Sequence, residues 1–271
     1  MATIGKGYEN FVLENKMTDL VNTNLDVNAL FTRDDSLAVE AGLDKIVHTY
    51  TYNNKDGVEQ LEKGAKNTKR GTVSYVPKKY TVKRYQQTFD YNDMDIMQDP
   101  YLLDVATTGA SVEMANEIRD EYFEQLALIG TADYAPDNTD TYSVLSYDVI
   151  VDALAAIGRE VENDMFIVMG LEGKRDIRKD EDYKASRQGE ILYSGQFGTI
   201  AGIPCLFTKH EACKNGDVFI TAKDQVKFFV KKDGSVEQDR DIETKDNTVV
   251  YERHGVMALV DTTKSFKLTR A

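Results

Sequence analysis

One long apolar stripe, between Tyr101 and Ile129, constrains the fold of this chain more than any other feature. Its apolar side chains recur every three or four residues, the spacing of one buried helix face. They are Leu102, Val105, Val112, Ala115, Ile118, Tyr122, Leu126 and Ile129. Asp99 and Pro100 before the stripe and Gly130 after it match the residues preferred at helix ends. The pattern predicts one helix about 43 Å long.

The opposite face of this predicted helix is acidic. It carries Glu113, Glu117, Asp120, Glu121 and Glu124, and Arg119 is its only base. A helix this long needs a long partner on its apolar side. We expect the acidic side to be exposed and available for docking.

The segment before the helix, residues 46–91, predicts a long two-stranded arm. Residues 46–52 and 72–91 alternate in strand-forming residue types, and the span between them is rich in Lys, Asn and Gly. An isolated hairpin is marginally stable in water. We therefore expect the arm to pack against another part of this chain or against another copy.

The arm is basic although the chain is acidic. Between Lys55 and Arg84 there are nine bases and three acids, a net charge of +6, whereas the predicted helix carries −5. Opposite charges of this kind favour docking of the arm on the helix, within a subunit or between copies. The alternative is that both are only solvated faces. The candidate contact residues on the arm are Lys63, Lys66, Lys69, Arg70, Lys78, Lys79, Lys83 and Arg84.

The rest of the chain predicts an α+β fold. Residues 1–45 are mixed in character and suggest an arm with one short helix at Ser36–Leu43. Ser146 is a good cap for a second helix, and a buried strand (Phe166–Met169) and a short helix (Leu171–Lys179) follow. From Gly195 onward the sequence is rich in strands separated by glycines, which indicates a second α+β region.

The composition narrows the range of functions. The chain has 271 residues and a net charge of −13, a poor match to a general nucleic-acid binder or to an anionic membrane surface. No apolar window is long enough to span a membrane. Two cysteines are too few for a disulfide framework, which favours a reducing compartment.

No motif indicates catalysis or cofactor binding. The chain lacks a nucleophile elbow, and its histidines (His48, His210 and His254) stand outside any catalytic motif. Cys205, His210 and Cys213 would supply only three zinc ligands, so we expect the cysteines to be buried and apolar in role. We predict no enzyme activity, cofactor or metal.

Several weak motifs, taken in order, resemble one known family. The strand at Phe166–Met169, the helix at Leu171–Lys179 and a polar loop precede GQFGTIAGIPCLFTK (195–209) and GDVFI (216–220). This order resembles the major capsid proteins of tailed bacteriophages, the Hong Kong ninety-seven type of shell subunit. Gly202 and Pro204 match the glycine–x–proline turn at which a strand of that family starts. The closing segment, 250–269, is also similar.

The resemblance implies an organisation for the whole chain, with the fold of a phage major capsid protein. Its parts would be an N-terminal arm (1–45), an extended loop formed by the long hairpin (46–91), a peripheral domain with the spine helix (92–145), an axial domain (146–245) and C-terminal strands returning to the peripheral domain (246–271).

The resemblance also implies a function. The chain would be a structural subunit that self-assembles into pentamers and hexamers of an icosahedral shell around the phage genome. Its partners would be its own copies, a separate scaffolding protein, a portal and, non-specifically at the inner surface, packaged DNA. It would be assembled in the host bacterial cytoplasm and reside in the virion, with no membrane partner. An encapsulin-type nanocompartment shell and an unfamiliar cytosolic hydrolase are the alternatives.

Overall fold

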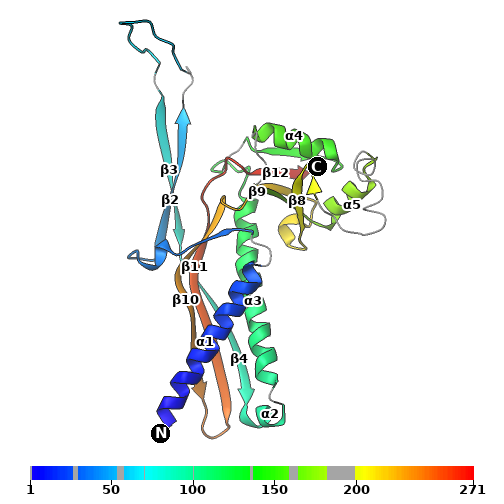
Figure 1. The fold of residues 1–271 in the computed structure, drawn as a ribbon. Coiled ribbons are helices and arrows are strands. Elements are labelled where there is room, and N and C mark those ends of the chain that lie inside the picture. The colour runs from blue at the N-terminus through cyan, green and yellow to red at the C-terminus, as the bar shows by residue number, and fades with distance from the viewer. Residues whose placement is uncertain are drawn as a thin grey trace.

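The chain folds into an elongated body from which one hairpin projects, as the computed structural model shows (Figure 1). The structure describes residues 2–26, 30–53, 58–69, 71–99, 101–134, 137–158, 164–181 and 199–271. The hairpin lies at one end of the body, and the short helix α2 (Asp93–Gln98) lies at the other. Two core sheets and their helices fill the space between.

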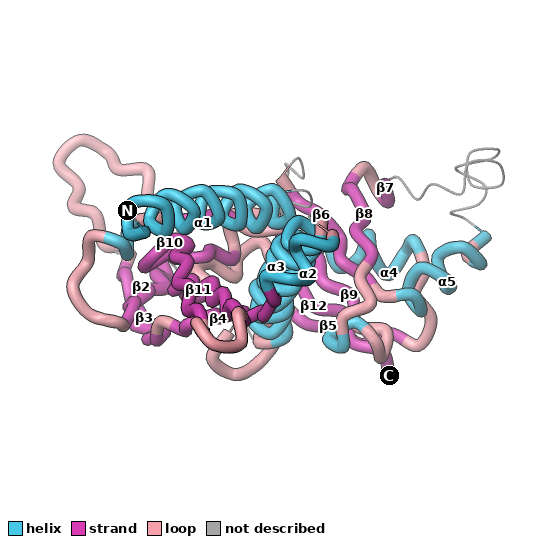
Figure 2. The backbone as a smooth tube through the Cα atoms, turned by 90° about the horizontal axis from the view of Figure 1, so that it is seen from below, coloured by secondary structure: helices cyan, strands magenta, loops and turns pink. Residues whose placement is uncertain are grey.

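A four-stranded sheet forms the long axis of the body. Its order is β1-β10-β11-β4, and β10 and β11 form a long antiparallel pair. The strands are β1 (Thr32–Asp34), β10 (Val226–Arg240), β11 (Asp246–Leu259) and β4 (Lys83–Asn92). Two long helices, α1 (Ala2–Asp26) and α3 (Leu102–Ala127), pack against each other and against this sheet (Figure 2). The main hydrophobic core lies between these two layers.

A six-stranded sheet with its own core forms the second part. Its order is β5-β12-β9-β6-β8-β7. The strands are β5 (Thr139–Tyr142), β12 (Phe266–Arg270), β9 (Val218–Ala222), β6 (Met165–Met169), β8 (Ile203–Phe207) and β7 (Thr199–Ile200). Helices α4 (Tyr147–Ile157) and α5 (Leu171–Lys179) contact this sheet. Every residue of β6 is buried, because this strand lies inside the sheet.

The projecting hairpin is a separate two-stranded sheet. Strands β2 (Asp44–Asn53) and β3 (Thr72–Thr81) pair antiparallel over their full length, with Tyr50 opposite Tyr75. A third small cluster, made by Leu37, Val47, Tyr80, Phe229, Val256 and Ala258, anchors its base to the four-stranded sheet. One 3₁₀ turn, η1 (Ser36–Ala38), carries Leu37 into this cluster. A second 3₁₀ turn, η2 (Glu211–Cys213), follows β8.

The long helix begins later than its sequence pattern predicts. Asp99 is not its N-cap: Asp99 follows α2, and its side chain accepts a hydrogen bond from the Tyr101 N–H (3.0 Å). Pro100 lies outside the described residues. The helix α3 starts at Leu102, runs for 26 residues and is followed by a turn in which Gly130 has a φ of +85°.

The buried face of α3 also differs from the predicted one in its first half. Leu102, Val105 and Val112 are exposed, and Thr107 and Ser111 are buried. Both hydroxyls donate to carbonyls of their own helix, to Asp104 (3.0 Å) and to Thr107 (2.7 Å). Because these local bonds satisfy the hydroxyls, polar residues can face the core at that point.

The N-terminal segment is a long helix and not the mixed arm that we expected. α1 has 25 residues, and of the predicted helix at Ser36–Leu43 only the 3₁₀ turn is present. Met17 and Val21 of α1 are fully buried against the main core. Leu13, Met17, Val21 and Leu25 recur every four residues along its core-facing side, a helical pattern that our prediction missed. Packing onto α3 and β10 stabilises the helix.

The predicted strand of residues 72–91 is two strands. The break falls at Val82, whose N–H donates to the Leu43 carbonyl (2.8 Å). β3 pairs with β2, whereas β4 pairs with β11 in the four-stranded sheet. The hairpin therefore ends at Thr81, and Lys83 and Arg84 belong to the body.

The sheet membership of two more strands, β10 and β12, does not follow the predicted division of the chain into domains. β10, within the segment assigned to the axial domain, pairs with β1 and β11 in the four-stranded sheet. β12, which we expected to return to the peripheral domain, pairs with β5 and β9 in the six-stranded sheet. Long-range pairing decides sheet membership, and the local sequence carries no signal for it.

Candidate intersubunit surfaces

The outer part of the hairpin exposes apolar and aromatic side chains to solvent. Tyr50, Val73, Tyr75 and Val76 are each more than half exposed, as is Ile46 nearer the base. The rings of Tyr50 and Tyr75 lie 6.2 Å apart between centroids and are tilted by 49°. Large exposed apolar patches mark contact surfaces in soluble proteins. This part of the hairpin therefore has the character of a surface that another chain covers.

The base of the hairpin is fixed to the body. The Tyr80 hydroxyl lies 3.0 Å from that of Tyr134 and donates to the Leu259 carbonyl (3.3 Å). The Lys78 ammonium lies 3.1 Å from the centroid of the Tyr134 ring. Burial raises the pKa of Tyr80 and lowers the pKa of Lys78. This anchoring holds the direction in which the hairpin leaves the body.

The predicted basic residues fall into two groups. Lys63 and Lys66 are exposed and Lys69 is half-buried in the loop at the hairpin tip, while Arg70 lies outside the described residues. In that loop Glu59 accepts hydrogen bonds from the N–H and the hydroxyl of Thr68, both at 3.0 Å. These bonds lower the pKa of Glu59. The tip therefore presents lysines on a loop that is bridged by the hydrogen bonds between Glu59 and Thr68.

The remaining predicted bases are occupied within the chain. Lys79 forms an ion pair with Asp44 of the same hairpin (2.8 Å). Lys83 forms one with Glu121 of α3 (3.2 Å). Arg84 donates to the side chain of Gln86 (2.6 Å).

The predicted acidic face of α3 is exposed except at Glu121, which is 5% exposed. Burial raises the pKa of this carboxyl, and the neighbouring Lys83 opposes that shift. Glu121 is therefore part of the body and not of a docking face, contrary to the prediction. On the exposed side, Glu113 accepts a hydrogen bond from Gln87 (2.6 Å), and Asp120 lies 3.4 Å from His210. Glu117 and Glu124 are exposed.

Gly202 and Pro204 lie at a tight turn between two strands. Ala201 and Gly202 link β7 to β8, and both have positive φ, +50° and +83°. This combination is typical of a two-residue hairpin turn, in which glycine is preferred. Pro204 is exposed in β8, opposite Thr199.

The end of the body opposite the hairpin carries a second apolar surface, which sequence reasoning missed. We call it the methionine tip; it consists of Met94, Met97, Tyr101, Val105 and Ile242, each more than two-thirds exposed. Asn92 caps α2 by accepting a hydrogen bond from the Met94 N–H (2.9 Å). This cap, followed by Asp93 and Asp95 in the first turn, was the available sequence signal.

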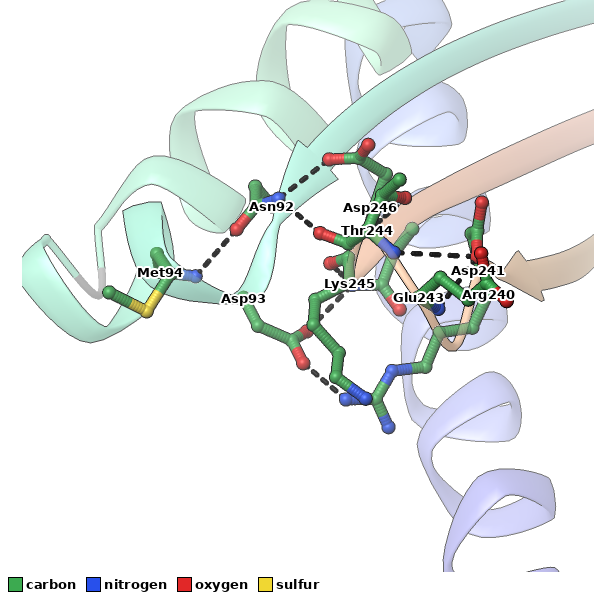
Figure 3. A network of polar contacts seen from close by, with 10 residues as sticks. Asn92, Asp93, Met94, Arg240, Asp241, Glu243, Thr244, Lys245 and Asp246 are labelled. Atoms are coloured by element: carbon green, nitrogen blue, oxygen red, sulfur yellow. Dashed lines mark hydrogen bonds and ion pairs between the residues drawn. The ribbon is translucent and has the colours of Figure 1, made fainter.

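A dense polar network holds the methionine tip in place (Figure 3). Asn92 donates to the Thr244 carbonyl (3.1 Å) and to the Asp246 carboxylate (2.6 Å). Asp93 accepts from Asn247 (2.7 Å) and forms an ion pair with Arg240. These contacts lower the pKa of Asp93, the Asn247 hydrogen bond foremost. They join α2 to the turn between β10 and β11, so the apolar residues are presented on a firm support.

The candidate metal ligands lie in different surroundings. Cys213 is buried in the main core and Cys205 in the core of the six-stranded sheet. His210 accepts a hydrogen bond from the Ala212 N–H through Nδ1 (3.1 Å). Within the described ranges, no three His, Cys, Asp or Glu side chains form a group able to hold a metal ion. None of the helices in the described part of the chain combines the length and apolar character needed to cross a bilayer.

Solved structures of phage shells have the same arrangement of elements. A chain of the cyanophage P-SCSP1u capsid superposes with a TM-score of 0.69 at 9% identity, covering 90% of this chain and 86% of that chain. A chain of the cyanophage Pam1 capsid gives 0.66 at 12% identity, covering 89% and 88%. This protein has the phage capsid fold. The Hong Kong ninety-seven type of fold expected from the order of motifs is thereby confirmed.

The fold is also similar to that of a chain from a virus-like particle. A chain of the virus-like particle from Pyrococcus furiosus superposes with a TM-score of 0.53 at 11% identity, covering 94% of this chain and 98% of that chain. No protein-family model matches the chain, and no curated protein matches it by sequence. At these identities the likeness establishes the capsid fold.

Proposed function

We propose that this chain is a major capsid protein, which assembles with its own copies into pentamers and hexamers of an icosahedral shell around a phage genome. The observation that carries the proposal is the projecting hairpin, with exposed apolar side chains along its outer part, on a capsid fold. Within one subunit these apolar side chains stay exposed to water. In a shell, the hairpin can extend across a neighbouring subunit, which would bury them.

The hairpin supplies the first contact between copies. Its base is anchored by Tyr80, so its outer part meets a neighbour in a set direction. Burial of the exposed Tyr50 and Tyr75 rings against that neighbour would remove apolar surface from water and favour association. The extended-loop role assigned to the hairpin thus has a physical basis at its apolar part.

Charge supplies the register of this contact. The lysines of the tip loop, Lys63, Lys66 and Lys69, with Arg70, would meet the exposed acids of a neighbour's α3, Glu113, Glu117 and Glu124. Asp120 lies 3.4 Å from His210 of its own chain and is a weaker candidate. Lys78, Lys79, Lys83 and Arg84 already have partners within the chain and are weaker candidates. Exposed ion pairs add little affinity, and their role would be to select the partner and its position.

The methionine tip supplies a second contact at the far end of the body. A subunit that contacts its neighbours at only one end cannot close a shell, because a lattice needs matching contacts on several sides. The tip is apolar and rigidly supported, as a contact surface between copies requires.

The remaining assignments extend the same proposal. The four-stranded sheet with α1 and α3 would act as the peripheral part of the subunit, and the six-stranded sheet as the axial part at five- and six-fold positions. Proposed partners are a separate scaffolding protein, a portal and packaged DNA held non-specifically at the inner surface. We propose that the shell assembles in the host bacterial cytoplasm and that the assembled protein resides in the virion.

Electron microscopy of the purified chain tests the proposal. We expect closed shells from the purified chain, alone or produced together with the proposed scaffolding protein. Size-exclusion chromatography of the same samples measures the unassembled fraction. A chain that stays monomeric under every assembly condition would contradict the proposal.

An encapsulin-type nanocompartment is the second candidate. The likeness to the virus-like particle from Pyrococcus furiosus favours it. The contents of purified particles distinguish the two: packaged DNA supports the phage shell, and an enclosed cargo enzyme supports the nanocompartment. Neighbouring genes for a terminase and a portal would also support the phage shell. A hydrolase activity is not part of either proposal.

A further inference from the structure

A groove separates the middle of α3 from the end of β8, and its volume is about 710 Å³. Four residues at helical spacing on α3, namely Asn116, Arg119, Asp120 and Phe123, line one wall. Leu30, Val168 and Leu206 supply apolar surface on the other sides. Neither the hairpin nor the methionine tip contributes to it. This volume lies in the usual range for binding sites, about 300–1,000 Å³.

Arg119 brings a cation into this groove without a described acidic partner. Its guanidinium donates to the Asn24 carbonyl and to the Asn116 side chain (3.4 Å), both of them neutral groups. Among the described residues it forms no ion pair. Burial lowers the pKa of Arg119, because it removes water from the guanidinium. A carboxylate bound in the groove would supply that compensation.

The single acid of the wall does not neutralise Arg119. Asp120 faces His210, whose Nε2 lies 3.4 Å from a carboxylate oxygen. The His210 ring stacks on Phe123, with 4.7 Å between ring centroids and 22° between planes. Asp120 therefore interacts with His210, across the groove from α3, and not with Arg119. Lys209, beside His210, adds an exposed second cation at the rim.

We propose that this groove binds an acidic amphipathic peptide segment of a partner protein. The apolar floor would take apolar side chains spaced along one helix face, and Arg119 and Lys209 would bind carboxylates beside them. A peptide fits better than nucleic acid, because two cations around an apolar floor are a poor match to a continuous phosphate backbone. The inference goes beyond shell formation, since it assigns a binding site for a different protein.

A direct binding assay tests this site on the unassembled full-length chain. The probe is a fluorescein-labelled 12-residue peptide with leucines at helical spacing and glutamates at the other positions. A matched peptide carries lysine in place of each glutamate. Fluorescence anisotropy should show at least tenfold tighter binding of the acidic peptide. Equal binding of the two peptides, or binding of neither, would overturn the proposal.

Substitutions in the chain locate the site. The double variant Arg119→Gln with Lys209→Gln should weaken binding of the acidic peptide at least tenfold. Lys209→Glu alone tests the same rim without touching the bonds of Arg119, and it should weaken binding severalfold. Lys214→Gln is the matched control, because Lys214 is exposed and pairs with Glu211 outside the groove (3.2 Å). Unchanged binding in both groove variants, or an equal loss in the control, would overturn the assignment.

A labelled DNA duplex run in parallel separates the main competing ligand. Duplex binding that the groove variants abolish, without peptide binding, would overturn the proposal in favour of nucleic acid. Since the assay uses unassembled chain, its failure leaves the proposed shell function standing. Failure to form shells would likewise leave the groove result intact.

Discussion

Lys83 of β4 and Glu121 of α3 form an ion pair within one chain, with 3.2 Å between the ammonium nitrogen and a carboxylate oxygen. The carboxylate is 5% exposed, whereas the lysine side chain is 54% exposed. The pair therefore ties the edge strand of the four-stranded sheet to the long helix. A buried carboxylate depends on its partner, because desolvation disfavours its charge.

Lys83→Met should destabilise the folded chain in a pH-dependent way. Burial raises the pKa of Glu121, and loss of Lys83 would raise it further. A raised carboxyl pKa means that stability falls as pH rises through the window between the unfolded and folded values. We expect a loss of about 1–2 kcal/mol in the free energy of unfolding at pH 8, discounted for the exposed lysine. Little loss should remain near pH 4, where Glu121 is protonated. Urea denaturation across this pH range measures both.

Lys79→Met is the matched control for this experiment. It removes the same charge from an ion pair, with Asp44, in which the lysine and aspartate side chains are 63% and 41% exposed. Solvent screens such a pair, so we expect no measurable change in stability. Losses of equal size in the two variants would show that Glu121 does not depend on Lys83.

The long helix was predictable from sequence because Ala115, Ile118, Tyr122 and Leu126 keep a helical period in its second half. The first half was not, since Thr107 and Ser111 are buried there with hydroxyls bonded to their own helix. The hairpin was predictable in existence but not in extent. Alternation continues without interruption through Val82, and only the pairing with Leu43 ends the hairpin there.

The contact surfaces, too, were only partly predictable from the sequence. The basic tip loop was visible in the charge count, because a charge count needs no knowledge of the fold. The burial of Glu121 was not visible, since Lys83 reaches it only through the pairing of β4 with β11. The helix α1 was predictable from the four-residue spacing of Leu13, Met17, Val21 and Leu25, and our prediction missed it. Its packing partners were not predictable, since they come from α3 and from strands more than two hundred positions later, such as Tyr251 beside Thr18 (3.4 Å).

Gly234→Ala should loosen the packing of α1 on the sheet. A Cβ at this position would lie 2.3 Å from the Thr18 hydroxyl and 2.5 Å from the Tyr251 ring. Overpacking of this kind costs about 1–3 kcal/mol. We expect a lower free energy of unfolding and faster amide hydrogen exchange along α1, measured by mass spectrometry.

Gly109→Ala is the control for this substitution. Gly109 lies inside α3, and a Cβ added there would have no heavy atom of a neighbouring element within 4 Å, so no clash arises. Alanine favours helix over glycine by up to about 1 kcal/mol, so this variant should be as stable as the original or more so. Equal destabilisation by both variants would contradict the close approach at Gly234.

Met94→Glu combined with Met97→Glu should block assembly without unfolding the subunit. Both side chains are exposed, at 70% and 78%, so the folded chain loses no core contact. New charges at an apolar interface would have to be desolvated on association, which is unfavourable. We expect an unchanged melting temperature and loss of shells in electron micrographs. The double change to leucine keeps the surface apolar and should retain assembly. Normal shells from the glutamate variant would remove the methionine tip from the interface.

Charge reversal of the hairpin tip should impair assembly more than folding. The variant replaces Lys63, Lys66, Lys69 and Arg70 with glutamate. The three lysines belong to a loop outside the cores, so the melting temperature of the unassembled chain should not change. Repulsion from the exposed acids of a neighbour's α3 should then reduce the yield of shells. Screening shortens the range of such repulsion, so part of the yield should return at high salt.

A compensating change makes the same prediction specific to α3. Glu117→Lys combined with Glu124→Lys, introduced into the charge-reversed chain, should restore shell yield, because opposite charges again face each other across the contact. The same pair of lysine substitutions in the original chain should lower the yield. Quantitative sedimentation of shells against free subunits measures all four proteins. Normal shells from the charge-reversed chain would refute electrostatic docking while leaving the fold untouched. Failure of the α3 change to restore yield would place the basic tip on another surface of the neighbour.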